Sequence, residues 1–299
     1  MTSGMIKSIK RKFRSEGLGG LVRGAVHKIV PRRLRGYRKY LAYFEGRIGV
    51  EVGGPSLVFG RRGLFPAYQV AACIDNFNFH NETTWEGIIT QGRTFFFDKN
   101  RPPGRQYIAE AGNLIERKSD SYDFVLSSHM LEHTANPLLA LSEWMRVLKP
   151  RGALLLVVPH KEGTFDHRRP TTSLDHLVED FERKTAEDDL THLPEILEFH
   201  DLDLDPGVEG IEAFKARSEK NPENRCLHQH AFDTRLTVQA IDLTGFQIHA
   251  VEPIRPCHIV VIATKLDDGR KPDNRCFLLP DADYCKSSPF WSDRIPCTA

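Results

Sequence analysis

The sequence predicts an α/β protein with a doubly wound, mostly parallel sheet of seven strands, an antiparallel C-terminal hairpin strand and a helical insertion. Three observations predict this fold class. Apolar strand-like runs alternate with helical patterns between residues 47 and 159, as in parallel strands joined by crossovers. A Gly53-Gly54 turn follows the first of these runs. The last two runs are joined by only five residues, too few for a crossover, so they must pair as a hairpin.

The first half of the chain is expected to supply five strands, near residues 47–52, 70–75, 105–109, 122–127 and 153–158. A short or irregular helix is expected near residues 56–63. A regular helix is predicted at 137–148, because apolar side chains recur on one face of it: Leu138, Leu141, Trp144, Met145 and Leu148. Pro150 and Gly152 then end this helix and permit the turn into the next strand.

The second half of the chain begins with residues 160–230, which are rich in His, Asp, Glu and Pro. This stretch is too long for a simple connection, so it is expected to form an insertion over a substrate pocket, with helices near 173–187 and 193–199. A helix at 232–243 and strands at 246–252 and 258–264 complete the main domain, residues 47–265. Residues 266–299 have turn composition without periodicity and are expected to form an irregular, draped or mobile tail.

Composition indicates an ordinary folded protein. The chain has 299 residues, of which 40% are hydrophobic and 27% charged, so disorder throughout is excluded. The longest apolar run, residues 153–158, is too short to cross a bilayer, and we expect no cleaved leader. Six Cys residues occur without CxxC pairs, which favours reduced thiols over a disulfide or zinc framework. We therefore expect a cytoplasmic protein.

Charge is distributed unevenly. Residues 1–40 carry twelve Lys or Arg against one acid, Glu16, a net charge of +11, and the remaining 29 basic and 39 acidic residues give −10. Apolar residues in this part recur at helical spacing, so residues 1–46 are expected to form a basic amphipathic segment that contacts an anionic membrane surface peripherally. Docking on the acidic remainder of the chain is an equal alternative. An organelle transit peptide stays open, and nucleic acid is not an expected partner.

Four sequence blocks carry a family resemblance. An acid and a glycine turn end the first strand in Glu51-Val-Gly-Gly-Pro-Ser56, and Asp75 follows at the expected end of the second strand. Glu110-Ala-Gly-Asn-Leu114 and Tyr122-Asp-Phe-Val-Leu-Ser-Ser-His-Met-Leu-Glu-His133 complete the set. In this order the blocks resemble class I S-adenosylmethionine-dependent methyltransferases, most closely the bacterial small-molecule and glycan branch, over residues 47–265.

The resemblance implies a Rossmann-like fold, S-adenosyl-L-methionine as cofactor and a set of binding residues. Glu51, Gly53 and Gly54 would hold its methionine part and Asp75 its ribose hydroxyls, while Glu110 and Ala111 would meet the adenine. Ser128 lies in the loop that would face both cofactor and acceptor. Pro55 stands where the family has a second motif glycine, which removes an amide donor, so other backbone groups are expected to hold the cofactor.

Histidines are the candidate general bases. A hydroxyl group that receives a methyl group must give its proton to a base, and the pKa of imidazole lies near neutrality. The loop after the fourth strand offers His129 and His133, and Leu227-His-Gln-His-Ala-Phe-Asp233 offers His228 and His230. The segment from His129 to His133 is similar in spacing to the Glu-x-x-Glu-His motif of metal-assisted O-methyltransferases. In this resemblance Glu132 would belong to the metal site, and His230 would be the further histidine that completes it. A divalent metal is therefore left open but not favoured, since Glu132 and His133 could simply order the loop.

The expected function is methylation of an oxygen on a sugar, glycan or other small polar acceptor, with catalytic candidates His129, Glu132, His133 and His230. Arg168 and Arg169 are candidates for contacting a phosphate or carboxylate on the acceptor. One alternative is a non-catalytic protein that binds S-adenosylmethionine as a scaffold or sensor. A nicotinamide-dependent oxidoreductase is a second, disfavoured because the chain lacks a full G-x-G-x-x-G after a strand and its terminal hairpin is unusual in such sheets.

Overall fold

The computed structural model describes residues 33–114, 117–205, 207–267 and 270–295. The predicted basic segment therefore lies outside the described residues up to residue 32. Across the described ranges, no helix has both the length and the apolar character needed to cross a membrane.

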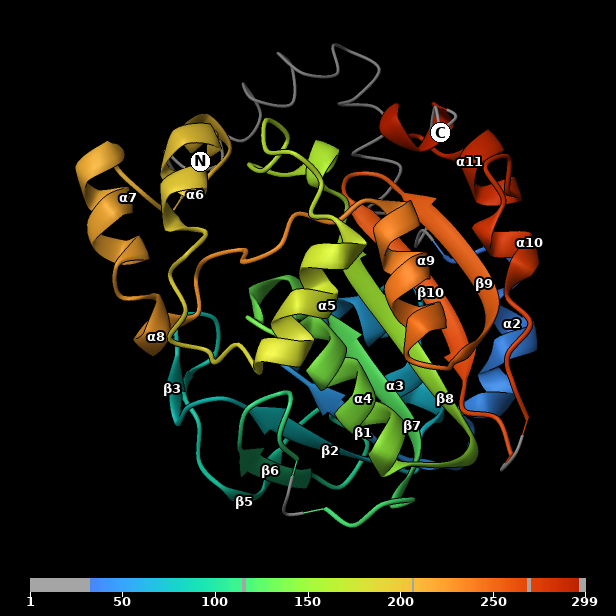
Figure 1. Cartoon of the computed structure of the whole chain (residues 1–299). Helices are drawn as coiled ribbons and strands as arrows, with labels where there is room; N and C mark the ends of the chain where they lie inside the picture. The colour runs from blue at the N-terminus through green and yellow to red at the C-terminus, as the bar shows by residue number, and fades with distance from the viewer. Residues whose placement is uncertain (1–32, 115–116, 206, 268–269, 296–299) are drawn as a thin grey trace, which may run out of the picture.

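A single large sheet forms the centre of the molecule (Figure 1). Its strand order is β5-β6-β2-β1-β7-β8-β10-β9, in which β6, β2, β1, β7 and β8 run parallel and β10 is antiparallel to both neighbours. The strands are β1 (Ile48–Val52), β2 (Cys73–Asn78), β5 (Gly92–Phe95), β6 (Gly104–Ile108), β7 (Tyr122–Ser128), β8 (Leu148–Pro159), β9 (Gln247–Ile254) and β10 (His258–Thr264), with a separate small hairpin of β3 (Glu82–Thr83) and β4 (Gly87–Ile88). The predicted α/β class and the antiparallel C-terminal hairpin are confirmed.

The sheet has eight strands where seven are predicted. The additional strand is β5, which pairs antiparallel with β6 at the edge of the sheet. It is four residues long and only Phe95 is buried, so the sequence carries no apolar alternation that would have revealed it. Two strands also differ in their bounds. Strand β2 runs three residues further than predicted and ends at Asn78. Strand β8 begins at Leu148, five residues before the predicted start, so Pro150 and Gly152 lie within the strand and not in a separate turn.

The helices range from single turns to eleven residues. They are α2 (Tyr37–Tyr40), α3 (Ala67–Val70), α4 (Pro137–Val147), α5 (Leu174–Arg183), α6 (Leu193–Phe199), α7 (Ile211–Ser218), α8 (Asn221–Asn224), α9 (Thr234–Leu243), α10 (Arg275–Leu278) and α11 (Asp283–Ser287). Short 3₁₀ turns occur at Leu41–Tyr43, Leu57–Phe59, Leu131–His133, Lys161–Gly163, Leu202–Leu204 and Ser292–Arg294. The irregular helix predicted near 56–63 is the turn at Leu57–Phe59, and α4 lies as predicted.

Both faces of the sheet are covered, and each has its own apolar core. Helices α4, α5 and α9 lie on the face turned toward the viewer in Figure 1, where Trp144 and Phe246 are fully buried. On the opposite face, residues 34–44 and α3 pack Phe44 and Phe65 against the strands. Burial from two sides explains why the central strands β7 and β8 read as nearly continuous apolar runs.

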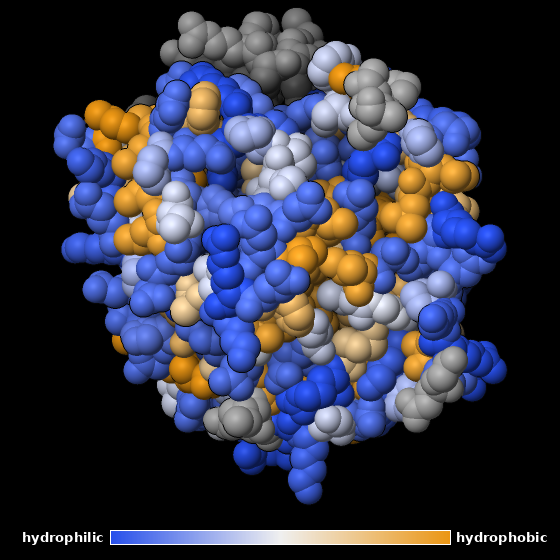
Figure 2. Space-filling view, viewed as in Figure 1, coloured by the Kyte–Doolittle hydropathy of each residue, from blue (hydrophilic) through white to orange (hydrophobic). Residues whose placement is uncertain are grey.

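The insertion divides into two parts. Helix α5 packs on the sheet through Leu177, whereas α6, α7 and α8 stand to one side of it (Figure 1). Helices α6 and α7 share a small core with the segment after α8, built on Ile196, Phe214 and Leu227. The viewed face of the molecule is largely hydrophilic, and apolar side chains gather near its middle and toward the C-terminal helices (Figure 2).

The C-terminal tail is helical in part, which differs from the irregular tail predicted. Tyr284 and Cys285 of α11 are buried in the core over α9 and β9. Asp293, nearly the last described residue, accepts hydrogen bonds from Ser288 and Thr234 and lies 3.3 Å from the Nε2 atom of His160. The helices of the tail are only four and five residues long, so their sequence offers no periodicity to detect.

Candidate active site

A cavity of about 630 Å³ opens where four parallel strands end. Its floor consists of the residues that close or follow β1, β2, β6 and β7, and its outer wall comes from the insertion and the β3–β4 hairpin. This is the place where open α/β sheets bind their ligands, and the volume suits a small organic molecule. Lining residues include Gly53, Asn78, Glu110, Ala111, Ser128, His129, Glu132, His133, Phe165, Arg225 and His228.

The glycine turn after β1 is fixed by close packing. Gly53 has a φ of +83°, and a Cβ atom there would lie 2.7 Å from Cγ of Met130. A Cβ on Gly54 would lie 2.2 Å from the carboxyl carbon of Glu51. Asn76 holds the turn from β2, accepting from the Gly54 amide and donating to its carbonyl at 3.0 Å each. The turn thus brings bare backbone to the cavity wall, and Pro55 lines the cavity beside it.

Glu51 lies behind this turn and is fully buried. Its carboxyl group accepts hydrogen bonds from the Tyr68 hydroxyl at 2.6 Å and the Ser56 amide at 3.0 Å. Burial raises the pKa of Glu51 to about 8, although both hydrogen bonds oppose the shift. Glu51 therefore supports the turn from beneath and is not a lining residue of the cavity.

Asp75 lies away from the cavity. It stands in the middle of β2, where its carboxylate accepts from the Arg105 amide and the Tyr122 hydroxyl and pairs with Arg117 at 3.2 Å. The expectation that Asp75 ends the second strand is wrong, because β2 continues to Asn78. Asn78 is the polar residue at the strand end, and it lines the cavity.

Glu110 and Ala111 follow β6 and line the cavity. The carboxylate of Glu110 pairs with Arg225 of the insertion at 2.6 Å. Arg225 also lies 3.7 Å from Glu187 and stacks over the ring of Phe79 at 5.2 Å. Burial and the neighbouring Glu110 charge raise the pKa of Glu187 to about 7. These contacts tie the insertion to the strand ends across the mouth of the cavity.

Glu132 is the centre of a group of imidazoles. Its Oε1 atom lies 3.7 Å from Nε2 of His133 and 3.9 Å from both Nδ1 of His129 and Nε2 of His228. Both carboxylate oxygens are buried and have no hydrogen-bond partner among the described residues. Burial raises the pKa of Glu132 to about 7, and the charge of His228 partly offsets that shift. The structure thus brings together three of the four predicted catalytic residues, His129, Glu132 and His133, and adds His228.

His228 is oriented by a buried carboxylate. Its Nδ1 atom lies 2.5 Å from Oδ2 of Asp166, and its Nε2 atom faces Glu132. Burial alone would lower the pKa of His228, but the charge of Asp166 and the hydrogen bond to it outweigh burial and raise it. Asp166 in turn pairs with Arg169 at 3.0 Å, and its pKa falls to about 2 because His228 and Arg169 outweigh burial. A histidine whose Nδ1–H is held by a carboxylate presents Nε2 as a proton acceptor.

Two other side chains at this wall limit the freedom of His228. The ring of Phe165 lies 4.5 Å from the His228 ring, and the ring of His133 lies 4.7 Å away, edge to face. Nδ1 of His133 lies 2.9 Å from the Leu227 carbonyl, to which it donates, so its Nε2 atom is left facing Glu132. Burial lowers the pKa of His133 to about 3, so this imidazole is neutral at pH 7.

Besides Glu51 and Asp75, three further candidate residues lie outside the cavity. His230 is buried outside the cavity, because the turn that points His228 inward carries it to the other side, near α5. Arg169 is also buried, and its guanidinium group donates hydrogen bonds to Asp166, Glu195 and the carbonyls of residues 228 and 229. Arg168 pairs with Asp201 and is not a lining residue of the cavity. Neither arginine lines the cavity.

One family model matches part of the chain. Residues 93–156 match the family model described as a methyltransferase domain. The matched residues run from β5 into β8. No curated protein matches the chain.

Solved structures with a similar fold include an S-adenosylmethionine-dependent methyltransferase from Mesorhizobium loti, with 16% identity and a TM-score of 0.45 over 77% of this chain and 96% of that chain. A second, from Methanosarcina mazei, has 16% identity and a TM-score of 0.42 over 76% and 97%. A third is the Burkholderia thailandensis 1,6-didemethyltoxoflavin-N1-methyltransferase with bound 1,6-didemethyltoxoflavin and S-adenosylhomocysteine, with 11% identity and a TM-score of 0.39 over 77% and 78%.

Proposed function

We propose that this class I S-adenosylmethionine-dependent methyltransferase transfers a methyl group to an oxygen of a sugar, a glycan or another small polar acceptor. The observation that carries the proposal is the Asp166–His228 pair on the cavity wall. An alcohol is a weak nucleophile until its proton is removed, and a histidine held by a carboxylate is suited to removing it. The carboxylates and guanidinium groups of Glu187, Asp205 and Arg225 on the same wall favour a polar acceptor.

The cofactor is assigned to the part of the cavity nearest the sheet. The Gly53 turn offers bare backbone to its methionine part, and Glu110 with Ala111 faces its adenine. Asn78 takes the role of ribose partner that the resemblance gave to Asp75, because Asn78 ends β2 and lines the cavity. Ser128 and His129 then lie between the cofactor and the wall that carries His228.

The residues of the chain supply proton transfer and alignment. When bound, the cofactor supplies a methyl group on a sulfonium sulfur, which passes to the acceptor oxygen as the C–S bond breaks and its electron pair returns to sulfur. Nε2 of His228 accepts the hydroxyl proton of the acceptor, while Asp166 holds Nδ1–H and stabilises the resulting imidazolium. Phe165 and His133 restrict the imidazole to this orientation, which favours an in-line arrangement.

Replacing His228 tests this proposal. We expect His228→Gln to bind S-adenosylmethionine in calorimetry with unchanged affinity and to lose methyl transfer by about 10² to 10⁴-fold. Transfer would be followed with labelled cofactor against a panel of monosaccharides, sugar nucleotides and lipid-linked saccharides. The control is His167→Gln, because His167 belongs to the same insertion but pairs with Asp201 and is not a lining residue.

Three outcomes would contradict the proposal. Transfer by His228→Gln at the wild-type rate would remove His228 as the base. Wild-type protein that binds the cofactor but labels no acceptor in the panel would favour the sensor. Binding of NAD without binding of S-adenosylmethionine would favour the oxidoreductase.

A metal-assisted form of the same reaction is the second candidate. The observation that favours it is Glu132, whose two buried carboxylate oxygens have no hydrogen-bond partner and lie near His133 and His228. A divalent cation at these three side chains would lower the pKa of the acceptor hydroxyl directly. The two forms differ in one result: chelator-treated enzyme that keeps its fold keeps methyl transfer if His228 acts alone and loses it if a metal takes part.

We also propose peripheral contact between the basic segment and an anionic membrane. The charge of +11 over residues 1–40 and the helical spacing of apolar residues there support it. Such contact would suit a lipid-linked saccharide as acceptor, because it would bring the cavity close to the membrane surface.

A further inference from the structure

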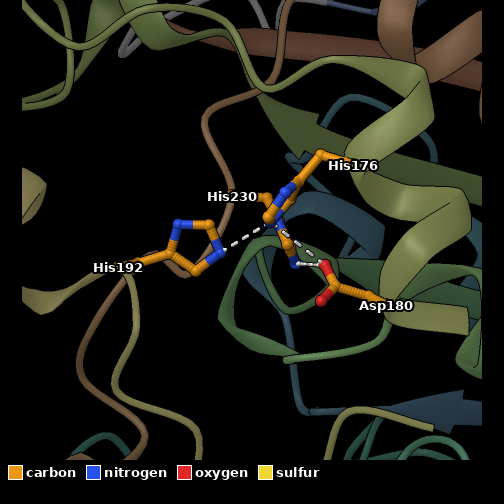
Figure 3. Close-up of side chains that lie close together, drawn as sticks. All are labelled: His176, Asp180, His192 and His230. Carbon is orange, nitrogen blue, oxygen red and sulfur yellow. Dashed lines mark hydrogen bonds and ion pairs between the residues drawn. The ribbon is translucent and has the colours of Figure 1, made fainter. Parts of the chain in front are cut away.

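Four side chains of types that can bind a metal ion converge outside the cavity, and they come from three parts of the chain (Figure 3). His176 and Asp180 are one turn apart on α5 and so share a face of that helix. His192 stands just before α6, and His230 lies in the loop that leads to α9. None of the four is a lining residue of the cavity, so this cluster is separate from the proposed site of methyl transfer.

Three separations between the ligand atoms are close to those around a tetrahedral cation. With bonds of about 2.1 Å, ligands at tetrahedral angles are about 3.4 Å apart. In the cluster, Nε2 of His176 lies 3.0 Å from Nε2 of His192 and 3.4 Å from Oδ2 of Asp180. Oδ2 of Asp180 lies 3.6 Å from Nε2 of His230. All four ligand atoms lie within 4.8 Å of one another.

The polar atoms are incompletely satisfied by one another. Oδ2 of Asp180 is buried, and the described part of the chain offers it no hydrogen-bond partner. Two Nε2 atoms, from His176 and His192, face each other, and only one of them can carry a proton in a hydrogen bond between neutral rings. Nε2 of His230 lies 3.3 Å from the Ala135 carbonyl, and its Nδ1 atom is buried without a partner. A cation in the centre would satisfy the acceptor atoms that point there.

The surroundings of the cluster fit a bound metal. The Thr185 hydroxyl donates to Oδ1 of Asp180 at 2.9 Å, which leaves Oδ2 turned toward the histidines. Asn136 donates to the Asp180 carbonyl at 2.8 Å and fixes α5 at this residue. The His176 side chain is 36% exposed, so a cation could enter from solvent.

We propose that His176, Asp180, His192 and His230 form a site for a divalent transition cation of the Zn²⁺ type. Three imidazole nitrogens and one carboxylate oxygen suit Zn²⁺ or Fe²⁺, whereas Mg²⁺ and Ca²⁺ prefer oxygen ligands. The site joins α5 and the residues before α6 to the loop before α9, which also carries His228. It would therefore link the start of α6 and the end of the insertion to α5, which packs on the sheet through Leu177.

Metal content and thermal unfolding of the full chain test this site. Wild-type protein that is stripped with a chelator and reloaded with Zn²⁺ is expected to retain one more equivalent of Zn²⁺ per chain than the Asp180→Asn variant. Zn²⁺ is also expected to raise the Tm of the wild-type protein by about 5 °C or more. Co²⁺ in place of Zn²⁺ should give the visible absorption of a tetrahedral nitrogen and oxygen site. In Asp180→Asn and His176→Gln, the affinity for Zn²⁺ at this site should fall by roughly 100-fold or more.

Two controls separate this site from the others. The His167→Gln variant should still bind the additional equivalent of Zn²⁺. It is a matched control because the side chain of His167 is also 36% exposed and lies on the insertion. His228→Gln should keep it as well, which excludes binding at Glu132, His133 and His228 as its source. Wild-type protein that retains no Zn²⁺, or variants that retain as much as wild type, would show that the four side chains form a hydrogen-bonded cluster only. Because metal content and Tm are read without an acceptor, the result is independent of the proposed function.

Discussion

Glu51 is a buried carboxyl group whose protonation is coupled to folding. Its pKa is raised to about 8 by burial, whereas in the unfolded chain it is near 4.5. Between these values the folded protein retains a proton that the unfolded chain releases, so the free energy of unfolding falls as pH rises. The limiting slope for one group is about 1.4 kcal/mol per pH unit.

Glu51→Gln should remove this dependence. We expect the Tm of the wild type to fall more steeply than that of Glu51→Gln as the pH rises from about 5 to about 8, with the variant more stable at the upper end. Thermal unfolding at several pH values measures this. Glu45→Gln, at an exposed carboxylate, is the control and should follow the wild type. Parallel curves for wild type and Glu51→Gln would mean that Glu51 stays ionised in the folded protein.

His228 and His230 show how far residue types can be assigned from sequence. Both are histidines of one short segment, and the resemblance selected His230. The structure turns His228 toward the cavity and His230 toward α5, because two residues of an irregular segment can face opposite sides. Only the position of Asp166, 62 residues earlier in the chain, identifies His228 as the oriented histidine. That contact is long-range and carries no local sequence signal.

The elements that the sequence predicts well are those with strong periodicity or long apolar runs. Helix α4 has its apolar face and an Asn136 cap, and β7 and β8 are buried from both sides. Strand β2 is displaced from its prediction because Val70 and Ala71 are as apolar as the strand itself, although they belong to α3 and the residue after it. Strand β5 and helices α10 and α11 are too short to show a period.

The C-terminal tail is attached through Asp293, which links the turn at Ser292–Arg294 to the start of α9. Its carboxylate accepts from the Thr234 and Ser288 hydroxyls at 2.7 and 2.6 Å. Burial alone would raise the pKa of Asp293, but the hydrogen bonds and the nearby His160 outweigh burial and lower it. Its stabilising contribution is therefore present above the unfolded pKa near 4 and is lost as the pH falls through the lower folded value.

Asp293→Ala should destabilise the protein by about 2–4 kcal/mol at pH 7, because it leaves buried donors without an acceptor. Urea denaturation followed by circular dichroism measures the loss. Asp281→Ala is the matched control from the same tail, since its side chain is 75% exposed and pairs only loosely with Lys286. The two variants should differ clearly, and equal stability of both would show that the tail is held by its apolar contacts alone.

At the scale of the whole molecule, most of the basic charge of residues 1–40 lies before residue 33, where the described part of the chain begins. Leu34 is buried, Arg33 donates to the carbonyls of Gly63 and Arg61, and Arg35 pairs with Glu252. These contacts anchor the described part of the N-terminal region to the sheet. Of the twelve basic residues in residues 1–40, eight lie in residues 1–32, where Glu16 is the one acidic residue. A protein that lacks residues 1–32 should therefore keep its fold while losing most of the positive charge.

This division allows the membrane proposal to be tested on a folded protein. We expect the full chain to pellet with vesicles that contain about 30% phosphatidylglycerol in 0.1 M salt, and to be released in 0.5 M salt, because each basic residue near an anionic surface contributes about 1 kcal/mol that salt screens. The protein without residues 1–32 should stay in the supernatant with an unchanged Tm. Neutral vesicles are the control. Equal pelleting of both proteins would assign the contact to the folded body, and no pelleting of either would favour docking of the basic segment on the acidic remainder of the chain.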